Sequence, residues 1–280
     1  SAALRGAPRV VVVGGGWIGC EVAAAARTLG AHVTIVEPED VPLKRVLGER
    51  MGAFFRAVHT DHGVEVLTGT GVESIEGGGR VERVWTSDGR MLHADVVVVG
   101  IGVCPASELA EGAGLAVANG IAVDAQLRTS VPDVFAAGDV ARFPHRLFGP
   151  MRIEHWANAL HQGPVAARSM LGADEPFDRV PYFFSDQYEV GMEYSGHATG
   201  EHELVIRGDV DSARFIAFWM QGDRVQAAMN VGVWDVVAEL QALIADQAPI
   251  DRDALQDGPQ SDEAGALAQL RLRSRAHRPH

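Results

Sequence analysis

The stretch Val10-Val11-Val12-Val13-Gly14-Gly15-Gly16-Trp17-Ile18-Gly19 decides the fold of the first part of this chain. Its four valines are β-branched and predict a strand that is buried on both faces. The glycines match the pattern G-x-G-x-x-G, in which Gly14 permits a tight turn, Gly16 lets a pyrophosphate approach the backbone and Gly19 lets a helix pack closely on the strand. The residues predicted to bind dinucleotide phosphates are therefore Gly14, Gly15, Gly16, Trp17, Ile18 and Gly19.

Residues after the glycines complete the context that this pattern requires. Residues 21–29 have strong helix propensity, and residues 32–36 alternate as a strand that ends at Glu37. A carboxylate at this position accepts a hydrogen bond from the ribose 2′-OH and repels a 2′-phosphate, so Glu37 predicts NAD in preference to NADP. Lys44 and Arg45 lie near enough to reach back to the site, and Arg45 is therefore also a candidate cofactor contact.

The same unit is expected to continue to about residue 118. One of its strands ends at Gly100-Ile101-Gly102. Glycines at the carboxyl end of a parallel strand let a ligand approach, although an ordinary exit from a strand explains them too. The pattern also predicts a helix at 47–61, a strand at 63–67, an antiparallel meander at 72–93 and a strand at 94–99.

The periodicity changes twice in the rest of the chain. Short strands are expected at 121–124 and 134–137, followed by a helix at 156–171. A run of aromatic and apolar strands then precedes a helix, which is typical of an α+β module. These elements are predicted at 182–190, 203–206, 215–220, 225–229 and 234–245.

A second motif, Thr129-Ser130-Val131-Pro132-Asp133-Val134-Phe135-Ala136-Ala137-Gly138-Asp139, is more specific than the glycine turn. It resembles the second flavin-binding motif of the FAD-dependent pyridine nucleotide oxidoreductases. The resemblance implies that Asp139 bonds to the ribityl chain of FAD and that Gly138 allows the close approach.

Two further segments resemble the ferredoxin and rubredoxin reductase branch of that family. The segment 154–163 is similar to the helix start beneath the isoalloxazine ring, where a helix N-terminus would stabilise the reduced flavin. This assigns Glu154, His155 and Trp156 to the cofactor site and Trp156 to the catalytic centre, although Trp156 is also explained as plain core. The segment 181–188 is similar to the start of the C-terminal domain.

Two residues take roles from the resemblance. Phe184 would lie near the flavin, although packing in a β core explains the aromatic residues of its segment equally well. Glu21 matches a family glutamate near the contact between nicotinamide and flavin, and it is a second catalytic candidate. An acid favoured by the dipole in the first turn of a helix is the alternative for Glu21.

The resemblance implies an α/β protein with a Rossmann-like NAD-binding domain at 1–118, a partial FAD-binding domain at 119–177 and a small α+β C-terminal domain at 178–255. The polar composition of residues 256–280 predicts a flexible tail that contains one frayed helix. Family members also carry a preceding βαβ unit that binds the adenosine end of FAD. The present sequence starts at the NAD unit, so we expect Asp139 to belong to half of an FAD pocket.

The function implied is hydride transfer from NADH to FAD, followed by electron transfer to an iron–sulfur protein. The physiological acceptor stays open, as does a homodimer. One alternative is a flavin-free NAD-binding module, and another is an interaction module that uses the C-terminal domain. The reductase reaction needs no protein acid, base or nucleophile, because the cofactor supplies the chemistry, in agreement with the lack of hydrolase motifs.

Composition restricts the partners. The net charge of −13 argues against nucleic acids and anionic membrane surfaces as partners. No apolar run is long enough to span a bilayer. The two cysteines, Cys20 and Cys104, form no C-x-x-C motif, which argues against a dithiol relay or a zinc ribbon and favours a reduced, cytoplasmic protein. Scattered histidines give no metal-binding pattern.

Overall fold

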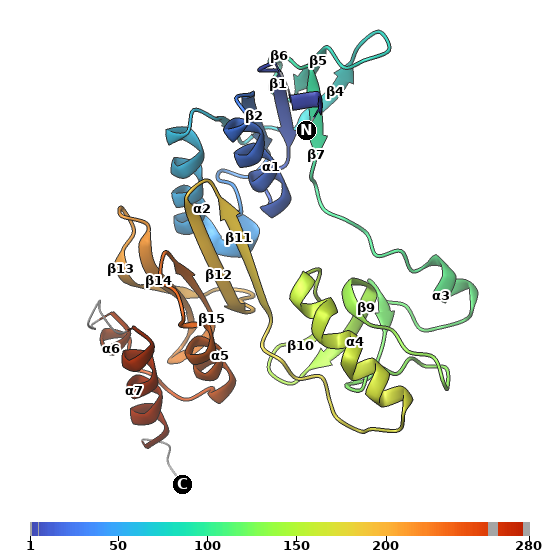
Figure 1. Ribbon diagram of the computed structural model, residues 1–280, viewed down its shortest axis with the longest axis vertical. Helices are drawn as coiled ribbons and strands as arrows, with labels where there is room; N and C mark the ends of the chain where they lie inside the picture. The colour runs from blue at the N-terminus through green and yellow to red at the C-terminus, as the bar shows by residue number, and fades with distance from the viewer. Residues whose placement is uncertain (1, 5, 257–262, 277–280) are drawn as a thin grey trace. The chain divides into compact units, whose positions relative to one another are not determined.

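The computed structural model describes residues 2–4, 6–256 and 263–276 (Figure 1). The chain divides into two compact units, which are described separately below. The first contains residues 1–103 and 185–191, and the second contains residues 104–184 and 192–280. The short segment 185–191 therefore packs with the N-terminal residues, although it is far from them in sequence.

A parallel four-stranded sheet forms the centre of the first unit, with the order β3-β2-β1-β7. The register places Val13 of β1 opposite both Val36 of β2 and Val99 of β7, so the carboxyl ends of these strands are level. This arrangement confirms the predicted Rossmann-like unit. The elements are β1 (Arg9–Val13), α1 (Trp17–Thr28), β2 (His32–Glu37), α2 (Lys44–Asp61), β3 (Glu65–Thr68) and β7 (Val96–Val99), with the short 3-10 helix η1 (Ala2–Leu4) before them.

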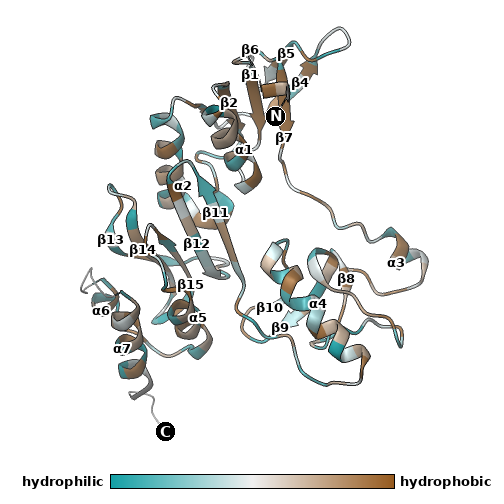
Figure 2. Ribbon diagram, in the orientation of Figure 1, coloured by the Kyte–Doolittle hydropathy of each residue, from teal (hydrophilic) through white to brown (hydrophobic). Residues whose placement is uncertain are grey.

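Valines of β1 contribute to the cores on both faces of this sheet, and most of the strand is hydrophobic in Figure 2. Val12 packs in the cluster that contains Ala23 and Ala26 of α1. Val11 packs on the opposite side with Leu67. Small alanines let the helix lie close to the sheet, which is what the glycine turn requires of the segment that follows it.

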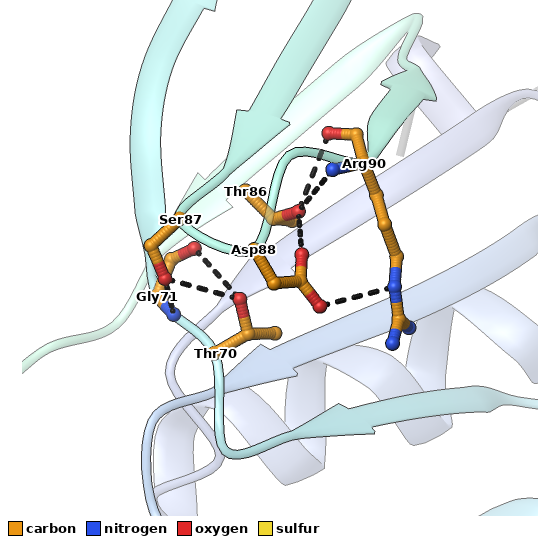
Figure 3. Close-up of polar contacts among 6 residues, drawn as sticks. All are labelled: Thr70, Gly71, Thr86, Ser87, Asp88 and Arg90. Carbon is orange, nitrogen blue, oxygen red and sulfur yellow. Dashed lines mark hydrogen bonds and ion pairs between the residues drawn. The ribbon is translucent and has the colours of Figure 1, made fainter.

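An antiparallel meander follows β3 and consists of β4 (Val72–Glu76), β5 (Arg83–Thr86) and β6 (Met91–His93). Figure 3 shows how polar side chains connect the β5–β6 turn to the loop after β3. The hydroxyl of Ser87 accepts a hydrogen bond from the backbone N–H of Gly71 at 3.0 Å and lies 3.1 Å from the hydroxyl of Thr70. These bonds join the meander to the end of β3.

The same turn is closed by a second group of contacts (Figure 3). The Thr86 hydroxyl donates to Asp88, and the guanidinium of Arg90 forms a 3.0 Å ion pair with the other oxygen of that carboxylate. The hydrogen bond from Thr86 and the charge of Arg90 lower the pKa of Asp88. Asp88 thus remains a charged acceptor that holds the turn.

The first part of the second unit contains a small three-stranded sheet and one long helix. Its sheet has the order β10-β9-β8, and its core includes Leu127, Phe143 and Val165. The elements are α3 (Glu108–Gly112), β8 (Ile121–Ala122), the 3-10 helix η2 (Gly138–Val140), β9 (Ala141–His145), β10 (Gly149–Arg152) and α4 (Trp156–Met170). The predicted strand at 134–137 is reduced to an isolated bridge between Arg128 and Phe135, because Asp133, with φ of 63°, turns the chain just before it.

The C-terminal module is a five-stranded antiparallel sheet with the order β11-β12-β15-β14-β13. Tyr188, with φ of 58°, ends β11 and makes a hairpin of the run that was predicted as one strand at 182–190. Phe218 and Leu240 lie in the core between sheet and helices. The elements are β11 (Tyr182–Gln187), β12 (Val190–Gly196), β13 (Glu203–Asp209), β14 (Arg214–Gln221), β15 (Arg224–Val231), α5 (Val237–Asp246), α6 (Arg252–Gln256) and α7 (Glu263–Ala276).

The segment predicted as a flexible tail from residue 256 differs from that expectation where the structure describes it. Helix α7 inserts Leu267 fully into the core of the C-terminal module. Glu263 forms a 2.5 Å ion pair with Arg207, which is only 2% exposed. Buried apolar and ionic contacts therefore hold in place a helix that the sequence predicted only as a frayed one. None of the helices in the described ranges combines enough length with enough hydrophobicity to span a bilayer.

Candidate functional site

The glycine turn brings the carboxyl ends of three strands together. Gly14, with φ of 99°, donates its backbone N–H to the carbonyl of Val36 at 2.9 Å. A Cβ at Gly14 would lie 2.4 Å from the carbonyl oxygen of Gly100. A Cβ at Gly19 would lie 2.0 Å from the carbonyl oxygen of Gly14. Only glycine fits at these two positions, because strand, turn and helix approach each other so closely.

Gly16 differs from the other two glycines, since nothing lies within 4 Å of the position of a Cβ there. It is the N-cap of α1 and provides no side-chain cap. No side chain caps the first helical turn, and space is open beside Gly16 at the positive end of the helix dipole, as an anionic ligand requires. Sequence reasoning assigned the same role to Gly16 from its place in the motif.

Glu37 lies at the end of β2 and is 8% exposed. Its Oε2 accepts a 2.6 Å hydrogen bond from the backbone N–H of Gly15, and its Oε1 accepts one from Glu39 at 2.9 Å. The carboxylate thus holds the glycine turn in place. Each oxygen has a second lone pair, so a ribose hydroxyl can still be accepted.

The two basic residues after β2 are engaged with acidic neighbours. Arg45 forms a 2.9 Å ion pair with Glu39 and its side chain is 80% exposed. Lys44 pairs with Asp40 at 2.5 Å. Neither cation is directed by these contacts toward the glycine turn.

The rim of this site is apolar. Ile101 is 75% exposed, Ile18 of α1 is 62% exposed, and Val99 at the end of β7 is 56% exposed. Gly102 has φ of 103°, so the chain turns directly after Ile101. Trp17, by contrast, packs edge-on against Phe55 with the ring centroids 5.7 Å apart. The structure therefore places Gly14–Gly19, Glu37 and Gly100–Gly102 at one edge of the sheet.

Glu21 is exposed on α1, and its Oε1 accepts a 2.7 Å hydrogen bond from the hydroxyl of Ser185. Ser185 is only 1% exposed and belongs to the segment that packs with the first unit. Sequence reasoning did not identify Ser185 as a site residue. Its partner is 164 residues away in sequence, so no local pattern could have indicated the contact.

A second candidate site lies in the second unit, around Gly138 and Asp139. Gly138 is buried with φ of 78°, and its N–H donates to Oε1 of Gln162 at 2.7 Å. Asp139 is exposed, and its backbone carbonyl accepts a 3.0 Å hydrogen bond from Arg152. Arg152 also pairs with Glu154 at 2.5 Å. These contacts hold the Gly-Asp turn and leave the Asp139 carboxylate facing solvent.

The N-terminus of α4 adjoins the same turn. His155 is its N-cap and makes no side-chain capping bond, while Trp156 is 72% exposed. The imidazole of His155 packs on Phe183 with the ring centroids 4.4 Å apart, next to the predicted contact Phe184, which is 54% exposed. Burial lowers the pKa of His155 to about 4, so the ring is neutral at pH 7. Because its side chain is 72% exposed, Trp156 is not part of the hydrophobic core.

The residues present fit the two cofactors to different extents. At the sheet edge, open space beside Gly16 and an uncapped helix start fit a pyrophosphate. In the second unit, Nδ1 of His155 and Nε2 of Gln162 are buried and have no hydrogen-bond partner among the described residues. Such orphaned atoms beside an exposed carboxylate and a free helix N-terminus fit one part of a polar ligand.

Comparison with known proteins identifies the family. The model of the pyridine nucleotide-disulphide oxidoreductase family matches residues 2–163, and that of the reductase C-terminal domain matches residues 182–262. The anthranilate 1,2-dioxygenase system ferredoxin–NAD(+) reductase component of Burkholderia cepacia is 42% identical, over 89% of this chain and 62% of its own length. Putidaredoxin reductase CamA of Pseudomonas putida is 38% identical, over 89% of this chain and 60% of its length.

Solved structures agree. The covalent putidaredoxin reductase–putidaredoxin complex gives a TM-score of 0.88 at 36% identity, covering 96% of this chain and 65% of the matched chain. The chain thus spans about three fifths of the length of the curated relatives above. It belongs to the pyridine nucleotide-disulphide oxidoreductase family and carries the reductase C-terminal domain.

Proposed function

We propose that this chain provides the NADH-binding part of an FAD-dependent oxidoreductase of the ferredoxin reductase type. The observation that carries the proposal is the edge of the parallel sheet, where Gly14, Glu37 and Gly100 meet beside the uncapped start of α1. A ligand crevice at the carboxyl ends of parallel strands is the general binding site of such sheets.

Each group at the sheet edge takes one role in binding. The N–H groups after Gly16 bind the pyrophosphate, and the Glu37 carboxylate accepts the ribose 2′-OH while it holds Gly15. Glu39 partly neutralises Arg45, the cation that could attract a 2′-phosphate, which supports NADH over NADPH. The strand order β3-β2-β1-β7 supports a pose with the adenosine on the β2 side and the nicotinamide on the β7 side, near Ile101.

The flavin-facing residues lie in the second unit. When bound, FAD supplies the chemistry that converts a hydride from NADH into single electrons. The Asp139 carboxylate would accept hydroxyl groups of the ribityl chain, and the start of α4 at Trp156 would direct N–H groups at the pyrimidine edge of the ring. Glu154 would fix Arg152 at this site, while His155 and Phe184 would form an aromatic wall.

Electron acceptors of the iron–sulfur type are supported by the relatives. One structure that resembles this chain is a covalent complex of a reductase with putidaredoxin, and several relatives are named as ferredoxin reductase components of dioxygenase systems. We infer an acceptor of the same class here.

A second candidate is a flavin-free NAD-binding module. One observation favours it: every feature of the sheet-edge site lies within the first unit, and none of these features depends on residues 104–184. This candidate retains NADH binding and removes the flavin.

The visible absorption spectrum of the chain, purified after incubation with FAD, tests the proposal. A retained flavin band that is bleached by NADH under anaerobic conditions supports the reductase. A protein that binds NADH but retains no flavin supports the second candidate. Lack of binding to either compound contradicts both.

A further inference from the structure

A chain of buried polar side chains connects Glu21 to the tip of the β11–β12 hairpin. The Ser185 hydroxyl donates to Glu21 at 2.7 Å, and the side-chain amide of Gln187 donates to the same hydroxyl at 3.2 Å. The Gln187 carbonyl oxygen lies 3.0 Å from Nε2 of His59, whose Nδ1 lies 3.2 Å from the hydroxyl of Tyr188. All five residues belong to the first unit.

The carboxylate fixes the direction of every bond in this chain. A charged Glu21 only accepts, so the single hydroxyl proton of Ser185 must point at it. Ser185 then accepts from the amide of Gln187, which directs the Gln187 carbonyl oxygen at His59. His59 must therefore carry its proton on Nε2, and its bare Nδ1 accepts from Tyr188.

Burial makes this arrangement rigid. The side chains of His59 and Gln187 are fully buried and Ser185 is 1% exposed, whereas Glu21 is exposed. Tyr188, at the tip of the hairpin, also stacks on His62, with the ring centroids 3.7 Å apart. Burial lowers the pKa of His59 to about 4, which keeps the ring neutral as the bond directions require. A buried network in which each member is satisfied holds one geometry.

We propose that Ser185, Gln187 and His59 are positioning residues that aim the Glu21 carboxylate at the nicotinamide end of the bound dinucleotide. The inference rests on the function proposed above. Glu21 lies in the second turn of α1, and the first turn of this helix meets the β7 side of the sheet edge, where the backbone nitrogen of Gly19 would be 3.6 Å from a Cβ at Gly100. A fixed carboxylate there stabilises the positive charge of the oxidised nicotinamide ring.

Calorimetric titration of the 280-residue chain with NAD⁺ and with ADP-ribose, which lacks nicotinamide, tests the proposal. We expect Ser185→Ala to weaken NAD⁺ about 3- to 10-fold and to leave ADP-ribose within about twofold, since only the nicotinamide contact is lost. The matched control is Ser195→Ala, because Ser195 is equally buried and its hydroxyl has no hydrogen-bond partner in the described part of the chain. This control should change neither affinity.

The outcomes distinguish the positioning role of Ser185 from the proposed NADH-binding function. If Ser185→Ala leaves the NAD⁺ affinity unchanged, or weakens both ligands equally, the positioning role is wrong while the proposed function stands. If the unmodified chain binds neither ligand, the proposed function itself fails and the inference fails with it.

A second measurement needs no variant. Nitrogen NMR of the histidine-labelled chain at pH 7 reports which ring nitrogen of His59 is protonated. The chain of hydrogen bonds from Glu21 to Tyr188 requires a neutral His59 ring with the proton on Nε2. A proton on Nδ1, or a charged ring, would contradict the bond directions from Glu21 to Tyr188 whether or not Ser185→Ala folds.

Discussion

The backbone N–H of Gly15 donates a 2.6 Å hydrogen bond to Oε2 of Glu37, which joins the glycine turn to the end of the neighbouring strand. The carboxylate that sequence analysis assigned to the ribose is therefore also part of the turn that is assigned to the phosphates. Its other oxygen accepts from Glu39 at 2.9 Å. Binding and local stability depend on the same side chain.

Replacing Glu37 should accordingly affect both properties. We expect Glu37→Ala to lower the free energy of unfolding by about 1–3 kcal/mol, because two backbone donors lose their acceptor, and to weaken NADH about 10-fold. Denaturant unfolding and calorimetry measure the two effects. Asp40→Ala is the control, since Asp40 is 72% exposed and forms a surface ion pair with Lys44. Normal stability and affinity in Glu37→Ala would contradict this account of the turn.

Two neighbouring glycines should respond differently to alanine. At Gly16 a Cβ meets nothing within 4 Å, whereas at Gly19 it would lie 2.0 Å from the carbonyl of Gly14. Gly16→Ala should cost less than about 1 kcal/mol of stability and still weaken NADH, because the methyl group occupies ligand space. Gly19→Ala should cost more than about 3 kcal/mol. Thermal melting combined with NADH titration checks both, and a stable Gly19→Ala protein would disprove the close packing.

Acid should destabilise the first unit through His59. Burial lowers the pKa of His59 to about 4 from an ordinary 6.5, so the unfolded chain binds this proton more readily. Its contribution is complete above pH 6.5 and is lost as the pH falls toward 4. Between pH 7.5 and 5 we expect the native chain to lose about 2 kcal/mol more than His59→Gln. Urea unfolding at both pH values measures this loss, and the exposed His32→Gln should behave as the native chain.

The ion pair of α7 should be essential to its packing. Arg207 is 2% exposed, so Glu263→Gln removes an anionic partner from a buried charge and should cost about 3 kcal/mol. Glu203→Gln removes a pair in which both side chains are 49% exposed and should cost less than about 1 kcal/mol. Denaturant unfolding followed by tryptophan fluorescence compares them. Equal losses would show that burial of Arg207 does not matter.

Local sequence patterns predicted the elements that depend on interactions between residues adjacent in sequence. The valines of β1, the glycine turn and the alanine-rich α1 are adjacent in sequence and were located to within a few residues. The break at Tyr188 was missed because one non-glycine residue with positive φ produces it within an aromatic run.

The unpredicted features depend on contacts between distant segments. His59 and Gln187 are 128 residues apart, and Arg207 and Glu263 are 56 apart. Neither pair leaves a periodic signal. The polar composition of α7 indicated a tail. The buried residue that pairs with Glu263 of this helix is Arg207 of β13, and a local pattern does not reveal such a distant contact.

Calorimetric titration of the unmodified chain with NADH and with NADPH tests the central claim most directly. The account predicts saturable binding of NADH at one site per chain and NADPH binding weaker by at least about 10-fold, because Glu37 repels the 2′-phosphate. No saturable binding of NADH, or equal affinity for both, would contradict the assignment of this sheet edge as an NADH site.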